Sequence, residues 1–265
     1  MNTPVFNVKI KAKKIIRYYR RELIPMGRHG TIAGRKAAQD SKRAASFTKY
    51  ARLITVAAKN GGDPDYNPTL RTAIDKAKAA GLPNDNITRA IKKGTGELGG
   101  ETYEELKFEG YGAGGVAVIV EALTDNKNRT TSSVKHAFDK FGGNLGTPGC
   151  VSYMFDTKGV LVFDKETGVT EDDLMMVALE AGADDIVEYE DSFDVLCAPE
   201  VFNDVVKAVK DAGLETVEAD IEQVPSMTSN PEGAALSQLK KMIEILEDDD
   251  DVQKVYTNSD VDLYE

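Results

Sequence analysis

The spacing of apolar residues predicts an amphipathic helix that begins near Phe47. Its apolar residues recur at intervals of three and four positions and line one face: Phe47, Tyr50, Ala51, Ile54, Ala57 and Ala58. Lys49, Arg52 and Lys59 fall on the opposite side of the same helix. The pattern is typical of a helix that packs one face on a core and presents cations on the other.

Five cations would share that second face if the helix extended back to Arg35. Arg35 and Lys42 precede Lys49 at seven-residue steps, which drift only about 20° around a helix. The same continuous helix would turn Lys36 and Arg43 to the apolar side, so we expect a break near residues 44–46. A short basic helix followed by a helix with cations on its outer face makes a positively charged surface that attracts phosphate. An outer face that only contacts solvent gives the same pattern.

The residues that follow predict two more helices, which complete a basic helical domain over 26–100. The Asn-Gly-Gly run at 60–62 ends the first helix by glycine C-cap chemistry. Asn67 then supplies an N-cap, with Pro68 at the first helical position, and Gly81 ends that helix. Pro83 opens the third helix, which ends at Gly94.

From residue 101 the pattern changes to short runs rich in β-branched residues. We predict a helix at 129–141 and strands at 106–111, 116–123 and 151–155. The next segment, 158–227, contains six elements: strand 160–164, helix 170–181, strands 186–189 and 193–197, helix 201–212 and strand 215–221. This βαββαβ order is the ferredoxin-like split βαβ pattern.

A predicted helix at 234–246 and a predicted strand at 252–256 follow this βαββαβ unit. The strands before residue 158 need one more helix and one more strand to complete a sheet of the same kind. We therefore predict that 101–157 and 229–258 form one discontinuous α+β domain, with 158–227 inserted in it. The predicted fold class is α+β multidomain: an N-terminal helical domain followed by two ferredoxin-like α+β domains, one inserted in the other. The acidic run 248–251 falls in the returning loop, where we expect a solvated turn.

The composition of the 265 residues is that of a globular chain, with a hydrophobic share of 41%. No apolar run approaches the roughly 20 residues that cross a bilayer. Cys150 and Cys197 belong to no CxxC motif, and only two histidines occur, which argues against a disulfide scaffold and a closed zinc site. We expect both cysteines to be small buried residues in a reducing cytoplasm, and we expect neither a metal nor a cofactor.

The two parts of the chain carry opposite charge. Residues 1–100 hold 21 lysines and arginines against 7 acidic residues, a net charge of +14, whereas residues 101–265 hold 12 against 37, a net charge of −25. Such asymmetry suggests that one part meets a polyanion while the other stays in solution or meets a basic partner. Any binding to nucleic acid therefore falls to the basic part.

Motifs for chemistry are absent. Two segments match GxGxxG, at 94–99 and 110–115, but neither follows a strand and opens a helix, as a dinucleotide site requires. We interpret both as turn glycines. The chain has no GxxxxGK[ST] loop, and His29 and His136 belong to no nucleophile or metal signature. We find no catalytic constellation and predict that the protein is not an enzyme.

The run Asp-Asn-Lys-Asn-Arg-Thr at 125–130 lies in the turn between a predicted strand and helix. Asn128 or Thr130 can cap that helix. Lys127 and Arg129 beside its positive N-terminus would make a corner that favours anions, although a capped loop with exposed cations explains the same residues.

The first 25 residues carry seven cations against a single acid, Glu22. They contain no serine and no long apolar core, so neither a transit peptide nor a secretory signal fits. We interpret them as an extension or disordered arm, or as the product of an upstream start codon with Met26 as the true first residue.

Several stretches, in this order over residues 26–258, together resemble the YebC/PmpR family, which includes the mitochondrial translational activators of cytochrome oxidase. They are RKAAQD at 35–40, FTK at 47–49, GGDP at 61–64, AIDKAK at 73–78, PNDNI at 83–87, RAIKKG at 89–94, EGYG at 109–112, DNKNRT at 125–130 and GGNLG at 142–146. Each is weak singly, but the ordered set is specific.

The resemblance implies a three-domain fold and a cytoplasmic gene-expression factor without enzymatic activity. Members are usually described as DNA-binding transcriptional regulators, and some instead act on ribosomes, where they ease translation of difficult stretches such as proline runs. The family usually opens with a segment that ends in Trp-Ala-Asn-Ile. Here His29 stands at the tryptophan position and the chain has no Trp, so a stacking role of that indole does not carry over.

We therefore interpret the chain as a nucleic-acid-binding regulator of gene expression that acts on duplex DNA and binds no membrane. A ribosome-associated translation factor that contacts ribosomal RNA is the main alternative, and an enzyme of unrecognised type is a distant third. The residues expected to contact phosphate are Arg28, Arg35, Lys36, Lys42, Arg43, Lys49 and Arg52, with Lys127 and Arg129 as a second set.

Overall fold

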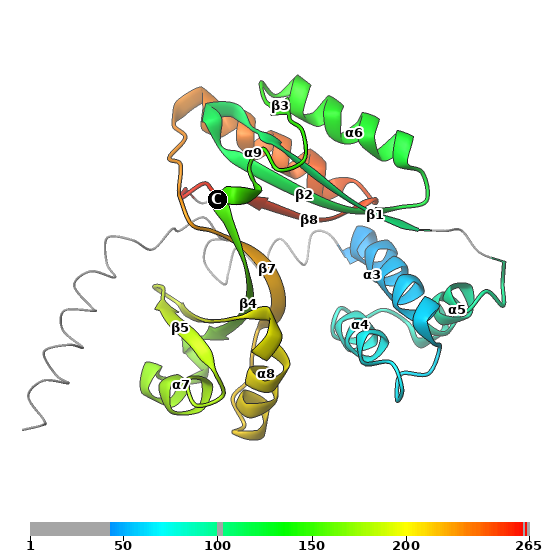
Figure 1. The fold of residues 1–265 in the computed structure, drawn as a ribbon, viewed down its shortest axis with the longest axis vertical. Helices are drawn as coiled ribbons and strands as arrows, with labels where there is room; N and C mark the ends of the chain where they lie inside the picture. Colours follow the sequence, from blue (N-terminus) through cyan, green and yellow to red (C-terminus); the bar gives the residue numbers. More distant parts are fainter. Residues whose placement is uncertain (1–42, 100–102, 262, 264–265) are drawn as a thin grey trace, which may run out of the picture. The chain divides into compact units, whose positions relative to one another are not determined.

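The structure of the protein is a computed structural model, which describes residues 43–99, 103–261 and 263 (Figure 1). The described residues divide into two compact units. One is Lys158–Glu222, and the other joins the described residues before Lys158 to those after Glu222. Among the described helices, none has the length and apolar character that a membrane crossing requires.

The helical part contains α3 (Arg43–Ala57), a short 3-10 helix (Ala58–Asn60), α4 (Pro68–Ala79) and α5 (Asn84–Gly94). The break expected near 44–46 is wrong, because α3 runs through these residues without interruption. Two of them are alanines, the strongest helix formers, and the segment holds neither glycine nor proline. The predicted cap of α4 is confirmed: the side chain of Asn67 accepts a hydrogen bond from the backbone N–H of Leu70, and Pro68 follows it.

Both glycine motifs serve packing and turns rather than a nucleotide. A Cβ on Gly94 would lie 2.3 Å from the carbonyl oxygen of Thr55, so glycine allows α3 and α5 to pack closely. In the second motif, Gly114 has a positive φ of 77° in the tight connection between the first two strands of the next sheet. The interpretation of these residues as structural glycines is confirmed for both segments.

The first sheet combines strands from two distant parts of the chain. Its strand order is β3-β1-β2-β8, and every pairing within it is antiparallel. Helices α6 and α9 cover one face (Figure 1). Phe138 of α6, Leu246 of α9 and Val120 of β2 belong to the same buried core. The elements are β1 (Glu104–Tyr111), β2 (Ala117–Thr124), α6 (Lys127–Lys140), β3 (Asn144–Leu145), α9 (Gly233–Asp248) and β8 (Val252–Thr257).

The strand predicted at 151–155 is wrong. Residues Ser152–Met154 form a 3-10 turn, and the short strand β3 pairs with β1. The cause is the buried carboxylate of Glu109 on β1, which accepts hydrogen bonds from the backbone N–H groups of Val151 at 3.1 Å and Ser152 at 2.9 Å. Because these donors serve a carboxylate, they are not available to a strand ladder.

The second sheet lies in the unit Lys158–Glu222 and its flanking residues, with strand order β5-β6-β4-β7. Helices α7 and α8 place Leu174 and Val205 on its core beside Phe163. The chain order is β4 (Phe155–Asp164), α7 (Glu171–Ala178), β5 (Ala183–Glu188), β6 (Ser192–Cys197), α8 (Phe202–Asp211) and β7 (Glu218–Pro225). This is the expected βαββαβ order, and the predicted α+β multidomain fold class is confirmed.

The limits of the domains remain a prediction, which fragments of the chain can test. We expect residues 155–227 alone to unfold cooperatively, because β4 to β7 close a sheet over their own core. Residues 101–157 alone should give no dispersed NMR spectrum, because they lack β8 and the α9 side chains that fill the core of the first sheet. As a control, joining residue 157 to residue 228 through a short glycine linker should restore cooperative folding. A folded 101–157 fragment would contradict the discontinuous domain.

Candidate nucleic-acid interface

Lys49 and Arg52 of α3, both assigned to phosphate from the sequence, face the turn between α9 and β8. Lys49 donates a hydrogen bond from Nζ to the carbonyl oxygen of Glu247 at 2.7 Å. Arg52 donates from Nη1 to Oδ1 of Asp251 at 2.7 Å and also to the carbonyl oxygen of Asp250. A segment about 200 positions away in sequence therefore covers this face of α3, which the sequence analysis had left to phosphate.

Asp251 also contradicts the expectation of a solvated turn at 248–251. Only 3% of this residue is exposed. Its carboxylate accepts hydrogen bonds from Thr130 Oγ1 at 2.7 Å, from Thr124 Oγ1 at 3.2 Å and from the Nη2 of Arg129 at 2.8 Å. A buried carboxylate requires such compensation, and here two guanidinium groups and two hydroxyl groups supply it.

The surroundings of Asp251 stabilise its charged form. Burial alone would raise the pKa of this carboxyl group, but the hydrogen bonds from Thr130 and Arg129 and the positive charges of Arg52 and Arg129 outweigh burial. Its pKa therefore lies below the usual value, and Asp251 is ionised at neutral pH.

The corner at the start of α6 is built differently from the prediction. Asn126, rather than Asn128 or Thr130, caps the helix by accepting a hydrogen bond from the backbone N–H of Arg129 at 3.1 Å. Arg129 pairs with Asp125 at 2.7 Å as well as with Asp251. These hydrogen bonds raise the pKa of the Arg129 guanidinium, and the one from Arg129 lowers the pKa of Asp125. The corner does hold anions, but they are carboxylates of the chain itself.

Lys127 stands apart from this network. It lies in the first turn of α6, is exposed, and forms no hydrogen bond or ion pair with any residue that the structure describes. Of the remaining predicted site residues, Arg28, Arg35, Lys36 and Lys42 lie outside the described residues, and Arg43 is described only as the first residue of α3.

The structure adds two cations that the sequence analysis did not assign to binding. Arg89 and Lys92 are exposed on α5, three positions apart and opposite the buried Ile87 and Ala90. Neither forms a hydrogen bond or ion pair within the described part of the chain. Lys93, four positions after Arg89, donates instead to the hydroxyl group of Tyr103 at 3.3 Å. The signal in the sequence that could have identified Arg89 and Lys92 was their place opposite the apolar residues of α5.

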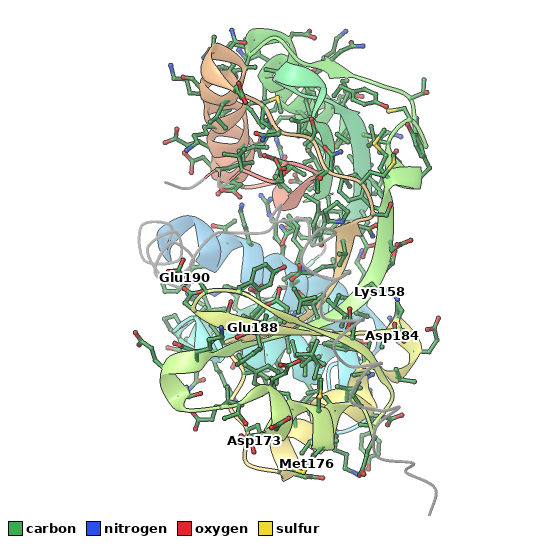
Figure 2. The ribbon with its side chains drawn as sticks, turned by 90° about the vertical axis from the view of Figure 1, so that its left-hand side faces the viewer. Lys158, Asp173, Met176, Asp184, Glu188 and Glu190 are labelled. Atoms are coloured by element: carbon green, nitrogen blue, oxygen red, sulfur yellow. The ribbon has the colours of Figure 1, made fainter. Side chains whose placement is uncertain are left out.

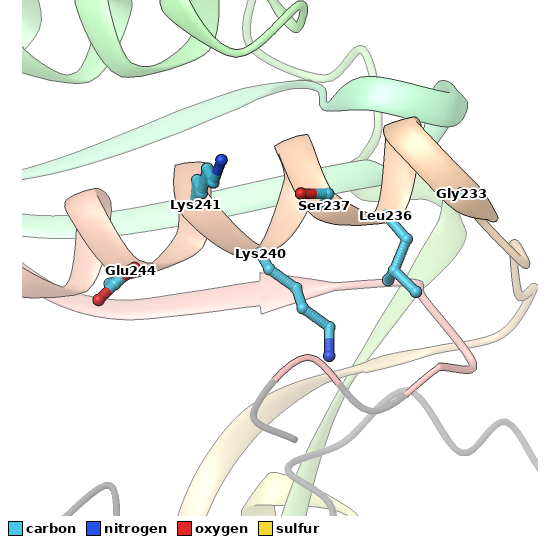
Figure 3. Close-up of a pocket in the computed structure, with 6 residues that line it drawn as sticks. All are labelled: Gly233, Leu236, Ser237, Lys240, Lys241 and Glu244. Atoms are coloured by element: carbon cyan, nitrogen blue, oxygen red, sulfur yellow. The ribbon is translucent and has the colours of Figure 1, made fainter.

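A shallow pocket of about 340 Å³ lies along α9, lined by Gly233, Leu236, Ser237, Lys240, Lys241 and Glu244 (Figure 3). All of these residues belong to one helix, so the pocket is a hollow on its surface. Within the described residues, no group of three or more His, Cys, Asp or Glu side chains is arranged to hold a metal ion.

Comparison with known proteins finds two family models that together match most of the chain. Residues 28–97 match the TACO1/YebC protein N-terminal domain, and residues 103–259 match the TACO1/YebC second and third domain. The second match bridges the first sheet and the unit inserted in it.

Similar proteins include several named as probable transcriptional regulatory proteins. One from Clostridioides difficile is 54% identical over 239 residues, which cover 89% of this chain and 100% of the relative. Another from Listeria monocytogenes is 52% identical over 231 residues, covering 87% and 96%. A crystal structure of a conserved hypothetical protein from Aquifex aeolicus aligns with a TM-score of 0.76 and 43% identity, over 83% of this chain and 91% of that one.

The charge of Asp251 should be visible in the stability of the chain. We expect Asp251→Asn to lower the free energy of unfolding at pH 7 toward the lower end of the about 3–5 kcal/mol typical of a broken buried ion pair. The half-exposed Arg129 regains water, which limits the loss. Because the folded pKa lies below the about 3.9 of an unfolded Asp, this stabilisation is present above pH 3.9 and disappears as pH falls through the folded pKa.

Urea unfolding at pH 7 and pH 3 measures this difference. The control is Asp184→Asn, which removes the same charge from an exposed ion pair with Lys158 and should cost no more than about 1 kcal/mol (Figure 2). Equal losses in the two variants at pH 7 would contradict a buried role for Asp251.

Proposed function

Because the chain belongs to the TACO1/YebC family, we propose that it regulates gene expression by binding nucleic acid, in the first place as a DNA-binding regulator of transcription. The names of the relatives support regulation of transcription, and the charge of the chain supports binding to nucleic acid. The proposal places this activity in the cytoplasm and assigns the protein no catalytic step.

The observation that carries the proposal is the segregation of charge along the chain. The helical part belongs to the segment with a net charge of +14, whereas both sheets belong to the segment with a net charge of −25. A polyanion is attracted to the first segment and repelled by the second. The helical part therefore supplies most of the attraction to a duplex, and the acidic residues of 101–265 oppose it.

Within the described residues, α5 offers the most accessible phosphate contacts. Arg89 and Lys92 are exposed and spaced so that both can reach one backbone. Lys127 is a further exposed cation in the first turn of α6, where the helix dipole also favours an anion. Contacts of this kind fix position without specifying sequence, so the proposal names no operator.

A ribosome-associated translation factor is the second candidate, favoured by the acidic surface of the inserted unit. Asp184, Glu188 and Glu190 lie on it, and all three are exposed (Figure 2). Such a surface suits basic ribosomal proteins, while the helical part would meet ribosomal RNA. Sedimentation of cell lysate through a sucrose gradient separates the two candidates: a transcription regulator stays near the top, and a ribosome-bound factor moves with the ribosomal fractions.

The test of the proposal reverses two charges on α5. We expect Arg89→Glu with Lys92→Glu to weaken binding to a duplex of about 20 base pairs and to flatten the dependence of log K on log salt. Each lost phosphate contact removes about 0.9 from the slope, so two contacts remove about 1.8. Fluorescence anisotropy of a labelled duplex, measured across a range of salt concentrations, gives both quantities.

The matched control is Lys207→Glu with Lys210→Glu on α8, which changes the net charge equally in the acidic unit. It should leave the slope unchanged. If both double variants weakened binding equally, net charge alone would explain the effect and α5 would not be a contact surface.

A further inference from the structure

The acidic turn, residues 247–251, covers the part of α3 that the sequence assigned to phosphate. Both described cations of that face donate to it: Lys49 to the backbone of Glu247, and Arg52 to the backbone of Asp250 and the carboxylate of Asp251. The turn is held on its other side by Ser133 of α6, whose hydroxyl group donates to Oδ2 of Asp249 at 2.5 Å. The turn therefore supplies these cations with oxygen acceptors, two backbone carbonyl groups and one carboxylate, in the place of a phosphate.

The carboxylate of Asp251 is a chemical counterpart of a phosphate in this position. Arg129 donates to it from Nε to Oδ2 at 3.1 Å and from Nη2 to Oδ1 at 2.9 Å, the bidentate geometry with which arginine also binds phosphate. Arg52 approaches the same group from α3. The guanidinium group of Arg129 is 51% exposed at its side chain, so a polyanion can reach it from solution.

We propose that the acidic turn is an intramolecular competitor of nucleic acid: it occupies Lys49, Arg52 and Arg129 in the free chain and leaves them when a phosphate backbone binds. This inference rests on the proposed function and adds its regulation. The free chain is then a closed form with reduced affinity, and the three cations become phosphate contacts only in an open form.

The exchange of one anion for another lowers the free energy needed to move the acidic turn away from the cations. The arginines remain neutralised throughout, because a phosphate replaces the carboxylate that leaves. Asp251 returns to water and regains its hydration, which offsets part of the lost contacts. A phosphate beside Arg52 would also meet the remaining acids of the turn, Asp248–Asp250, at close range, and their repulsion drives the turn away from the bound backbone.

Closure reduces the apparent affinity in proportion to the fraction of open chains. A variant that weakens the hold on the turn should therefore bind nucleic acid more tightly than the wild type. Loss of an ordinary binding residue would instead lower the affinity for nucleic acid, so the sign of the change in affinity distinguishes the two roles.

Two variants of the full chain weaken that hold in different ways. Asp251→Asn removes the charge that pairs with the arginines. Thr130→Val removes the hydroxyl donor at 2.7 Å from Asp251 without any change of charge, and Thr130 is fully buried, so it is not itself a phosphate contact. Asp184→Asn is the matched control, because it deletes one acid from an exposed ion pair in the inserted unit.

Binding to the labelled duplex is measured for all four proteins across salt concentrations, and thermal unfolding of each variant verifies that it is folded. We expect Asp251→Asn to bind at least about fivefold tighter, with a steeper salt slope by about 0.9 for each cation released. Thr130→Val should bind about twofold tighter, because it removes one hydrogen bond to Asp251 but leaves the charge that pairs with the arginines. Asp184→Asn should match the wild type.

The outcomes separate this inference from the function on which it rests. If the wild type binds and neither Asp251→Asn nor Thr130→Val binds more tightly than Asp184→Asn, competition by the turn is refuted and the proposed function stands. If Asp251→Asn fails to fold, Thr130→Val decides by the same criterion. If none of the four proteins binds a duplex even at about 50 mM salt, where phosphate contacts are strong, both proposals fall.

Discussion

The buried carboxylate of Asp251 and the two arginines that neutralise it are the interaction on which the arrangement of the larger unit depends. Three segments supply the partners of Asp251: α3 gives Arg52, the end of β2 gives Thr124, and α6 gives Arg129 and Thr130. A carboxylate that is almost fully buried is costly unless each of these donors is present. Among residues 43–99 and 103–261, the helices of the basic part and the first sheet have separate apolar cores, and this polar contact joins them.

The same interaction follows from the way the first sheet is completed. Its last strand, β8, follows all strands of the second sheet along the chain. It pairs with β2, at the edge of the first sheet opposite to β3. The turn that leads into β8 must therefore lie beside the end of β2, where the backbone N–H of Leu123 donates to the carbonyl oxygen of Asp251 at 2.7 Å. The discontinuous topology brings a strongly acidic segment of an acidic region against the basic helix α3.

Much of the fold could be predicted from the sequence because it rests on local chemistry. Asn67 and Pro68 encode the start of α4 through a cap and a fixed φ, and the alternation of strand and helix signals encodes the βαββαβ unit. The strand predicted at 151–155 failed because Glu109, some 40 positions earlier, takes the N–H groups of Val151 and Ser152. A local apolar pattern contains no information about such a distant acceptor.

The candidate site was less predictable for the same reason. The identity of α3 as a basic amphipathic helix was accessible from periodicity, but the partners of Lys49 and Arg52 come from residues near 250. A run of four aspartates is typical of a solvated turn, and nothing in its composition distinguishes the one residue that is buried. Conversely, Arg89 and Lys92 were not assigned to binding from the sequence, and only the structure shows that both of these cations of α5 remain exposed.

The acidic turn and a nucleic acid backbone should compete for the same cations, and hydrogen exchange of the wild-type chain, with and without a saturating duplex, measures this competition. We expect the amide of Leu123, which donates to Asp251, and the amide of Val252, which donates to Asp249, to exchange faster in the bound state, while amides of α3 exchange more slowly. Unchanged or slower exchange at Leu123 and Val252, in a chain that has demonstrably bound the duplex, would contradict it.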